Sequence, residues 1–293
     1  MFKYTSKVLP KHTKEFLVEI DWEIINVKQE ESFAELMALV TAPGFRKGKA
    51  PKDVASQFIN PEKVYERVVR KILPEMYKEL IDKENLKPVV TPSVELTEAK
   101  ANMPWKLTVQ VAEIPEVKLK DYKPQISALH KKAIDDKSKA TDVTDSSSND
   151  KPTKDPKAKT LAPLSQVFTT LLANAEVDIP DLLIAEEVNR RLSQLVEDVR
   201  KVGMTVDQYL SSKQMTLDVL KANITKDSDE MYKLEFILAK IAEIEKLAVE
   251  QAELEAIMAN ARTAKEKEIA KSNLAWYETL LRKQKVIDFL NYL

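Results

Sequence analysis

The chain has 293 residues, and its 46 basic and 47 acidic side chains give a net charge of −1, which indicates a well-mixed polar surface and argues against a general nucleic-acid binder. Only three residues are glycine, which excludes phosphate-binding glycine loops and turn-rich all-β folds, because both need glycine for positive φ angles or close backbone approach. With no cysteine and two histidines, the chain has no disulfides or thiol chemistry and a poor basis for a histidine metal site or triad, so we expect no metal and no cofactor.

The beginning of the chain, residues 1–7, has no apolar segment that could act as a signal sequence. No run of about 18 apolar residues, the length that crosses a membrane, occurs further along. We therefore expect a cytoplasmic protein without a membrane partner.

The first 122 residues show both strand and helix patterns. Alternation of apolar and polar residues predicts strands over 2–9, 16–20, 88–96 and 105–111. Apolar residues at helical spacing predict helices over 33–40 and 65–76, with Pro74 expected to kink the second helix or start a new turn. The order of these elements predicts an α+β domain over 1–122, with helices packed on a four-stranded antiparallel sheet.

The sharpest motif of the chain is Pro-Gly-Phe-Arg-Lys-Gly-Lys-Ala-Pro over residues 43–51, between two predicted helices. Two of the three glycines, Gly44 and Gly48, lie in it and are expected to shape a constrained loop. The loop presents one aromatic ring and three cations: Phe45, Arg46, Lys47 and Lys49. This combination suits a partner surface that is part protein and part phosphate, because arginine binds carboxylate or phosphate through two N–H groups and lysine supplies a point charge.

The loop has two simpler interpretations. Gly44, Gly48 and Lys49 superficially resemble a nucleotide-binding P-loop, but three residues separate the glycines where four are needed, and Ala50 stands where a magnesium-binding hydroxyl belongs. Nucleotide binding is therefore not expected. An ordinary turn with a solvated charge cluster remains open from the residues alone.

The middle of the chain, residues 123–160, has a composition that cannot build a core. Between Lys131 and Thr160 there are eight lysines, six aspartates, four serines, four threonines and two prolines. Such a segment buries too little apolar surface to offset its ordering entropy. We therefore predict a flexible low-complexity linker over 123–160.

The last part of the chain, residues 161–293, is predicted to be helical, because all fourteen prolines lie at or before Pro180. Gly203 is expected to end a helix over about 184–202, and Thr205 with Gln208 forms a capping-box pair for a short helix. Longer helices are predicted near 229–248 and 264–292. The expected fold is thus multidomain and elongated, with an α+β domain followed by an all-α domain.

The string Gly-Phe-Arg-Lys-Gly-Lys-Ala-Pro at 44–51 resembles the signature of trigger factor, a family of bacterial ribosome-associated chaperones. The resemblance covers about residues 1–122 and resumes over about 171–293. It implies a ribosome-binding domain over 1–122 and a helical chaperone domain over 161–293. The loop would dock beside the nascent-chain exit of the large ribosomal subunit, on a ribosomal protein and nearby rRNA. The implied ribosome contacts are Gly44, Phe45, Arg46, Lys47, Gly48 and Lys49.

The resemblance further implies that the C-terminal helices form arms that cradle unfolded nascent polypeptides without ATP. Members of the family can dimerise, so a homodimer is one expected state. The family also carries a prolyl-isomerase domain between the two matched regions, whereas the interval here, 123–170, is short and contains no glycine. We therefore expect a chaperone that is not an enzyme and has no catalytic residues.

Other functions stay open from the sequence alone. One is a prolyl isomerase with the full activity of the family, and another is a holdase that works without ribosomes. A periplasmic type of chaperone is disfavoured by the missing signal sequence. An RNA-binding protein using residues 44–52 is disfavoured because residues 1–122 carry 20 basic and 19 acidic groups, a near-neutral balance.

Overall fold

The computed structural model describes residues 2–100, 102–140, 161–259, 268 and 271–293. Contacts divide the chain into two compact units, neither of which is continuous in sequence. The first unit comprises Met1–Ile114 and Pro180–Glu186, and the second comprises Pro115–Ile179 and Glu187–Leu293.

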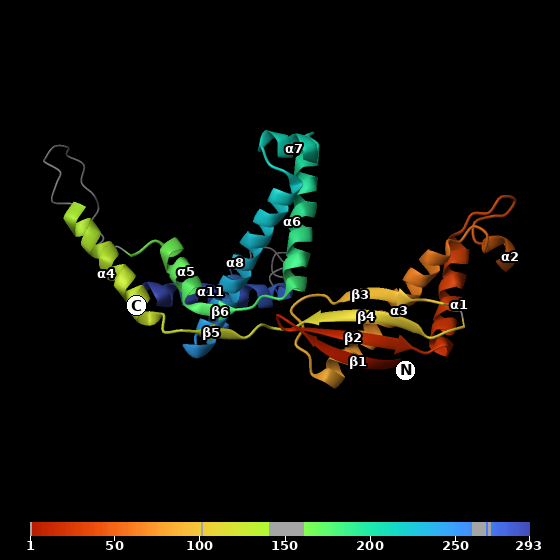
Figure 1. The fold of residues 1–293 in the computed structure, drawn as a ribbon, viewed down its shortest axis with the longest axis horizontal. Coiled ribbons are helices and arrows are strands. Elements are labelled where there is room, and N and C mark those ends of the chain that lie inside the picture. Colours follow the sequence, from red (N-terminus) through yellow and green to blue (C-terminus); the bar gives the residue numbers. More distant parts are fainter. Residues whose placement is uncertain (1, 101, 141–160, 260–267, 269–270) are drawn as a thin grey trace. The chain divides into compact units, whose positions relative to one another are not determined.

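The first unit is built on a four-stranded antiparallel sheet, which confirms the predicted α+β architecture (Figure 1). Its strands lie in the order β1 (Phe2–Leu9), β2 (Thr13–Ile20), β4 (Trp105–Ala112) and β3 (Ser93–Glu98). Strand β3 begins later than predicted, and Pro88 makes only an isolated bridge to Glu113. The short strand β3 forms one edge of the sheet and the longer β1 forms the other.

Three helices accompany this sheet: α1 (Trp22–Leu39), α2 (Lys52–Ala55) and α3 (Pro61–Glu84). The core between sheet and helices contains Phe16 of β2 and Trp105 of β4, each at most 1% exposed. Helix α3 continues through Pro74 and is neither ended nor restarted there. Pro74 is exposed, so water can reach the Arg70 carbonyl that the proline leaves without a donor.

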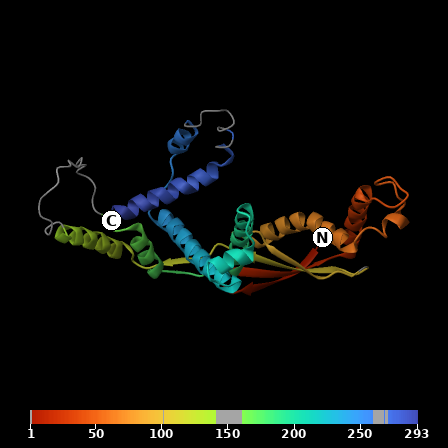
Figure 2. The ribbon, with the colours of Figure 1, turned by 90° about the horizontal axis from the view of Figure 1, so that it is seen from above.

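The second unit is mainly helical, but it also holds a two-stranded antiparallel sheet that the all-α prediction missed. Strands β5 (Val117–Leu119) and β6 (Ala175–Val177) form it. Its helices are α4 (Lys123–Ala140), α5 (Leu164–Ala173), α7 (Val206–Ser212), α8 (Leu217–Ile244), α9 (Gln251–Ala259) and α11 (Leu274–Asn291), together with α6 (Asp181–Lys201) from Glu187 onward. Helices α8 and α11 pack together, as do α4 and α5 (Figure 2).

The connection between α6 and α7 follows the predicted signals. Gly203 has a φ of +75°, and the next amide, of Met204, donates to the Val199 carbonyl at 3.1 Å, as in a glycine-terminated helix. The Thr205 side chain then accepts from the Gln208 amide, and the Gln208 side chain accepts from the Thr205 amide. The predicted helix end and capping box are both confirmed.

Part of the predicted linker is folded, which corrects the expectation for residues 123–140. This segment is helix α4, and its side chains Ile126 and His130 are buried. The His130 ring accepts the Ala162 amide at Nδ1 (3.1 Å), and its Nε2 donates to the Leu290 carbonyl (3.0 Å). Residues 141–160 of the predicted linker lie outside the described residues. Among the helices that the structure does describe, none has the length and apolar character that crossing a membrane requires.

Candidate functional site

The loop between α1 and α2 is fixed at both ends by small buried side chains. Helix α1 ends at Leu39, and the Val40 amide caps it by donating to the carbonyls of Leu36 and Met37. Further along, Ala42 is 1% exposed and Ala50 is 7% exposed. The residues between these two alanines form a loop whose ends are anchored in the core of the first unit.

The two loop glycines have positive φ angles, +80° at Gly44 and +75° at Gly48, which other residues adopt only with strain. Their surroundings differ. A Cβ atom at Gly48 would lie 2.6 Å from the carbonyl oxygen of Ala38, whereas a Cβ at Gly44 would meet nothing within 4 Å. The Gly48 amide also donates to the Val40 carbonyl at 2.9 Å. Gly48 therefore holds the loop against the end of α1, and Gly44 only permits the turn.

The side chains between the glycines point into solvent. Phe45 is 42% exposed, and Arg46, Lys47 and Lys49 are all exposed. Within the described part of the chain, none of these three cations has a carboxylate at ion-pair distance. The structure thus presents an aromatic ring on one short loop beside cations that no carboxylate of the described residues neutralises.

Two neighbouring features were missed by sequence reasoning. Phe58, on the segment that follows α2, is 49% exposed, and Leu39, at the end of α1, is 53% exposed. The Lys52 ammonium lies 5.7 Å from the centre of the Phe33 ring, which ties α2 to α1. The sequence shows an aromatic residue, Phe58, next to a helix bounded by prolines. Nothing in the sequence indicates whether such a residue is exposed or belongs to the buried core.

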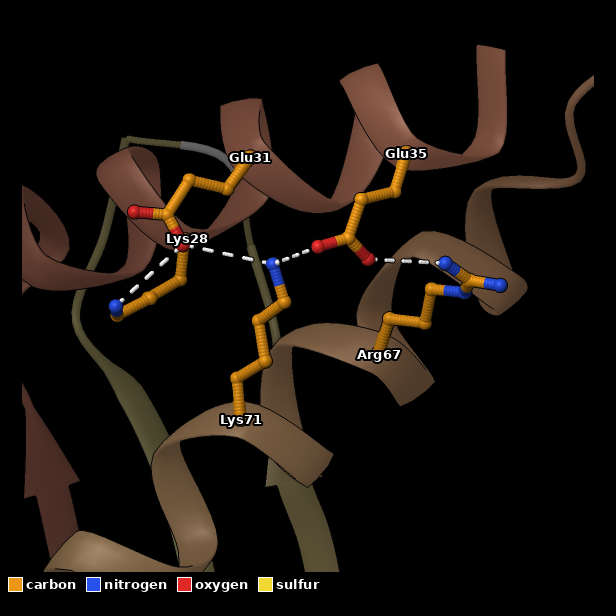
Figure 3. A network of polar contacts seen from close by, with 5 residues as sticks. All are labelled: Lys28, Glu31, Glu35, Arg67 and Lys71. Carbon is orange, nitrogen blue, oxygen red and sulfur yellow. Dashed lines mark hydrogen bonds and ion pairs between the residues drawn. The ribbon is translucent and has the colours of Figure 1, made fainter. Parts of the chain in front are cut away.

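A network of ion pairs joins α1 to α3 below this loop (Figure 3). Lys71 of α3 reaches Glu35 at 2.8 Å and Glu31 at 3.5 Å, Arg67 reaches Glu35 at 3.0 Å, and Lys28 reaches Glu31 at 3.4 Å. The Lys71 ammonium lowers the pKa of Glu35, and Glu35 in turn raises the pKa of Lys71. The network holds the last turns of α1, and so the start of the loop, on a helix of the core.

The second unit contains a buried carboxylate that joins α6 to α8. Glu187 accepts two hydrogen bonds from Arg190 at 2.8 and 2.7 Å and one from Arg191 at 2.6 Å. The Tyr232 hydroxyl of α8 approaches the same carboxylate at 3.4 Å. Hydrogen bonds from Arg190 and then from Arg191 outweigh the effect of burial and lower the pKa of Glu187 to about 2.

Several large apolar side chains on or next to α6, α7 and α8 are exposed. They are Val196, Val202, Met204, Leu217, Val219 and Met231. Isolated exposed apolar residues are normal, but several on adjoining helices form the kind of surface that binds other apolar chains. Methionine adds adaptability, because its unbranched thioether fits differently shaped partners.

Comparison with known proteins gave matches at both ends of the chain. A family model described as bacterial trigger factor protein matches residues 2–145, and a second, described as the trigger factor C-terminus, matches residues 157–290. Between the two matched segments lie only residues 146–156. Together the models cover almost the whole chain.

Individual relatives agree with these models. A trigger factor of Limosilactobacillus reuteri is 38% identical over 105 residues, which are 36% of this chain and 24% of the relative. A trigger factor of Listeria innocua is 36% identical over 105 residues, covering 36% of this chain and 25% of the relative. The aligned regions thus span about a quarter of the length of these curated relatives.

A solved structure shares the fold over nearly the whole chain. It is a trigger factor chaperone studied for promiscuous substrate recognition in folding and assembly, with a TM-score of 0.60 at 14% identity, covering 99% of each chain.

Proposed function

The chain belongs to the trigger factor family, and we propose that it is a cytoplasmic chaperone that associates with the large ribosomal subunit, binds nascent polypeptides at the exit, and assists their folding without ATP. The observation that carries the proposal is the loop at residues 43–51. Phe45 is 42% exposed, and Arg46, Lys47 and Lys49, which follow it, have no ion pair within the described chain. A loop built in this way has unsatisfied binding capacity.

The chemistry of the loop suits the proposed ribosome contact. Arg46 can bind a phosphate or a carboxylate through two N–H groups, and Lys47 and Lys49 add positive charge near the rRNA backbone. Phe45 would enter an apolar pocket of the ribosomal protein and anchor the complex. Because Ala42 and Ala50 are buried, the loop loses little freedom on binding, and this preorganisation favours affinity.

The second unit would bind the client. The exposed apolar side chains on α6, α7 and α8 offer a surface on which extended apolar segments can bind weakly and exchange. The Tyr232 hydroxyl of α8, 3.4 Å from the Glu187 carboxylate of α6, links these two helices. No nucleotide is needed, because release follows from weak binding.

The test is co-sedimentation with salt-washed ribosomes. We expect Phe45→Ala, Arg46→Ala and Lys47→Ala together to abolish co-sedimentation, with an unchanged circular dichroism spectrum. A matched control removes one exposed apolar residue and two exposed lysines elsewhere in the first unit. It combines Leu17→Ala, Lys3→Ala and Lys7→Ala on the open face of the four-stranded sheet. Binding that survives the loop substitutions, or that the control removes equally, would contradict the assignment.

We also propose that the chain is not an enzyme. The supporting observation is that residues 146–156 alone separate the two matched segments, an interval much shorter than a folded domain. Isomerase activity is the alternative, and it predicts faster cis-to-trans conversion of a proline tetrapeptide, which takes tens of seconds or longer without catalysis. A rate above background would establish the alternative.

A further inference from the structure

Strand β3 leaves one side of its backbone unpaired. It lies at the edge of the sheet, and within the described residues it pairs only with β4. An edge strand presents N–H and C=O groups to which another extended chain can hydrogen-bond. Alternation along β3 directs Val94 and Leu96 toward the helices and leaves Glu95 exposed on the open face.

An apolar groove runs beside this free edge, between β3 and α3. Its volume is about 520 Å³, and Tyr65, Val69 and Leu73 of α3 face Val94 and Leu96 of β3 across it. All five side chains are half-buried and pack against the core of the first unit. The Tyr65 ring meets Trp105 of β4 edge-on, with 5.2 Å between ring centres, so the wall of the groove is fixed.

Strand β1 forms the other edge of the sheet, and the end of α3 contacts side chains on the inner face of this strand. The Tyr4 hydroxyl of β1 donates to Glu84 at 2.8 Å, and the Lys83 ammonium lies 5.6 Å from the centre of the Phe2 ring. The end of α3 thus contacts the inner side of β1. Nearer its start, α3 leaves its own apolar side chains half-exposed beside β3. The groove is a specific feature of the β3 edge.

The rim of the groove is acidic. Glu66 is paired with Arg70 at 2.7 Å, whereas Glu62, which also lines the groove, has no cationic partner among the described residues. A segment with lysine or arginine beside its apolar residues therefore matches the groove in charge. Its backbone must be extended, because only an extended chain can pair with β3.

We propose that this groove binds an extended apolar segment of an unfolded polypeptide, which adds to β3 as a fifth strand and places alternate side chains between Leu96 and Leu73. The inference rests on the proposed chaperone function, for which it supplies a client site in the first unit. Apolar side chains in the groove provide affinity, the unpaired backbone of β3 fixes the direction of the chain, and Glu62 selects basic flanks.

The probe for this site is a fluorescent eight-residue peptide of alternating valine and threonine with lysine at each end, titrated into the full chain and followed by anisotropy. Leu96→Asp places a charge in the groove and should raise Kd at least about tenfold. Thr97→Asp places the same charge on the opposite face of the same strand and should leave Kd within about twofold. Equal binding by the Leu96→Asp variant and the wild type overturns the proposal.

Hydrogen exchange tests the wild-type protein directly, so the proposal does not depend on the folding of a variant. Saturating peptide should slow exchange of the amides over residues 93–98. Protection confined to the second unit overturns the groove while leaving the chaperone function intact. Failure of the proposed function would instead appear as wild-type protein that does not co-sediment with ribosomes. The two peptide experiments do not depend on ribosome binding, so the two failures can be told apart.

Discussion

At the scale of single residues, the same amino acid serves two different purposes in the loop. Gly44 and Gly48 both have positive φ, but only Gly48 lies against the backbone of Ala38. Two glycines four residues apart are visible in the sequence, and they indicated a constrained loop. Which of them bears the packing constraint depends on where α1 ends, and that is known only from the folded chain.

Replacing each glycine by alanine separates these purposes. Gly44→Ala should cost about 1 kcal/mol of unfolding free energy, because alanine is strained at positive φ. Gly48→Ala should cost roughly 1 kcal/mol more, since the backbone must also move away from the Ala38 oxygen. Urea unfolding measures both, and ribosome co-sedimentation should weaken more for Gly48→Ala. Equal losses from the two variants would show that the contact with Ala38 is unimportant.

The exposed ring and cations were also predictable one residue at a time, because their types stand in the sequence. The absence of ion-pair partners for these cations was not predictable in this way. That Arg46, Lys47 and Lys49 have no carboxylate at ion-pair distance could be established only by locating the acidic side chains of the described residues around them. Phe58 was missed for the same reason: exposure is a property of the fold, and an isolated phenylalanine is more often buried.

At the scale of elements, local signals predicted the sheet and the end of α6, whereas the start of α8 and the existence of α4 were not predicted. Helix α8 begins at Leu217, well before the predicted 229, because Thr216 caps it by accepting from the Val219 amide. The polar composition of residues 123–140 predicts a linker, whereas the structure has helix α4 there. Its buried stripe of Ile126 and His130 is short, and His130 bonds to residues 32 and 160 positions away.

The junction of α6 with α8 yields a prediction about pH. The pKa of Glu187 falls from 4.5 when the chain is unfolded to about 2 when it is folded, so its ion pairs stabilise the protein above about pH 4.5 and lose that effect as pH falls toward 2. Glu187→Gln should therefore lower the unfolding free energy by about 2 kcal/mol at pH 7 and by clearly less at pH 3.

Urea unfolding at the two pH values measures this difference. The control is Glu197→Gln on the exposed side of the same helix, which should change stability by less than about 0.5 kcal/mol at either pH. A loss for Glu187→Gln that is as large at pH 3 as at pH 7 would mean that packing around residue 187, and not the charge of Glu187, stabilises the protein at this position.

At the scale of the whole molecule, positive and negative charges almost cancel. The net charge is −1, and residues 1–122 carry 20 basic and 19 acidic groups. Many of these are paired on the surface, as in the network of Lys71 with Glu35 and Glu31. A molecule with this balance has little general attraction for rRNA, so its electrostatic affinity for ribosomes should come from the few cations of the loop.

The small number of loop cations sets the salt dependence of ribosome binding. Each phosphate contact contributes about 0.7 to 0.9 to the slope of log K against log salt, so three loop cations give a slope of about −2 to −3. Arg46→Ala should reduce the magnitude of the slope by about 1, and Lys7→Ala on the open sheet face should leave it unchanged. Co-sedimentation across a series of salt concentrations measures both slopes. A wild-type slope steeper than about −5 would require cationic surfaces beyond this loop, and the docking role of residues 43–51 would then be only partial.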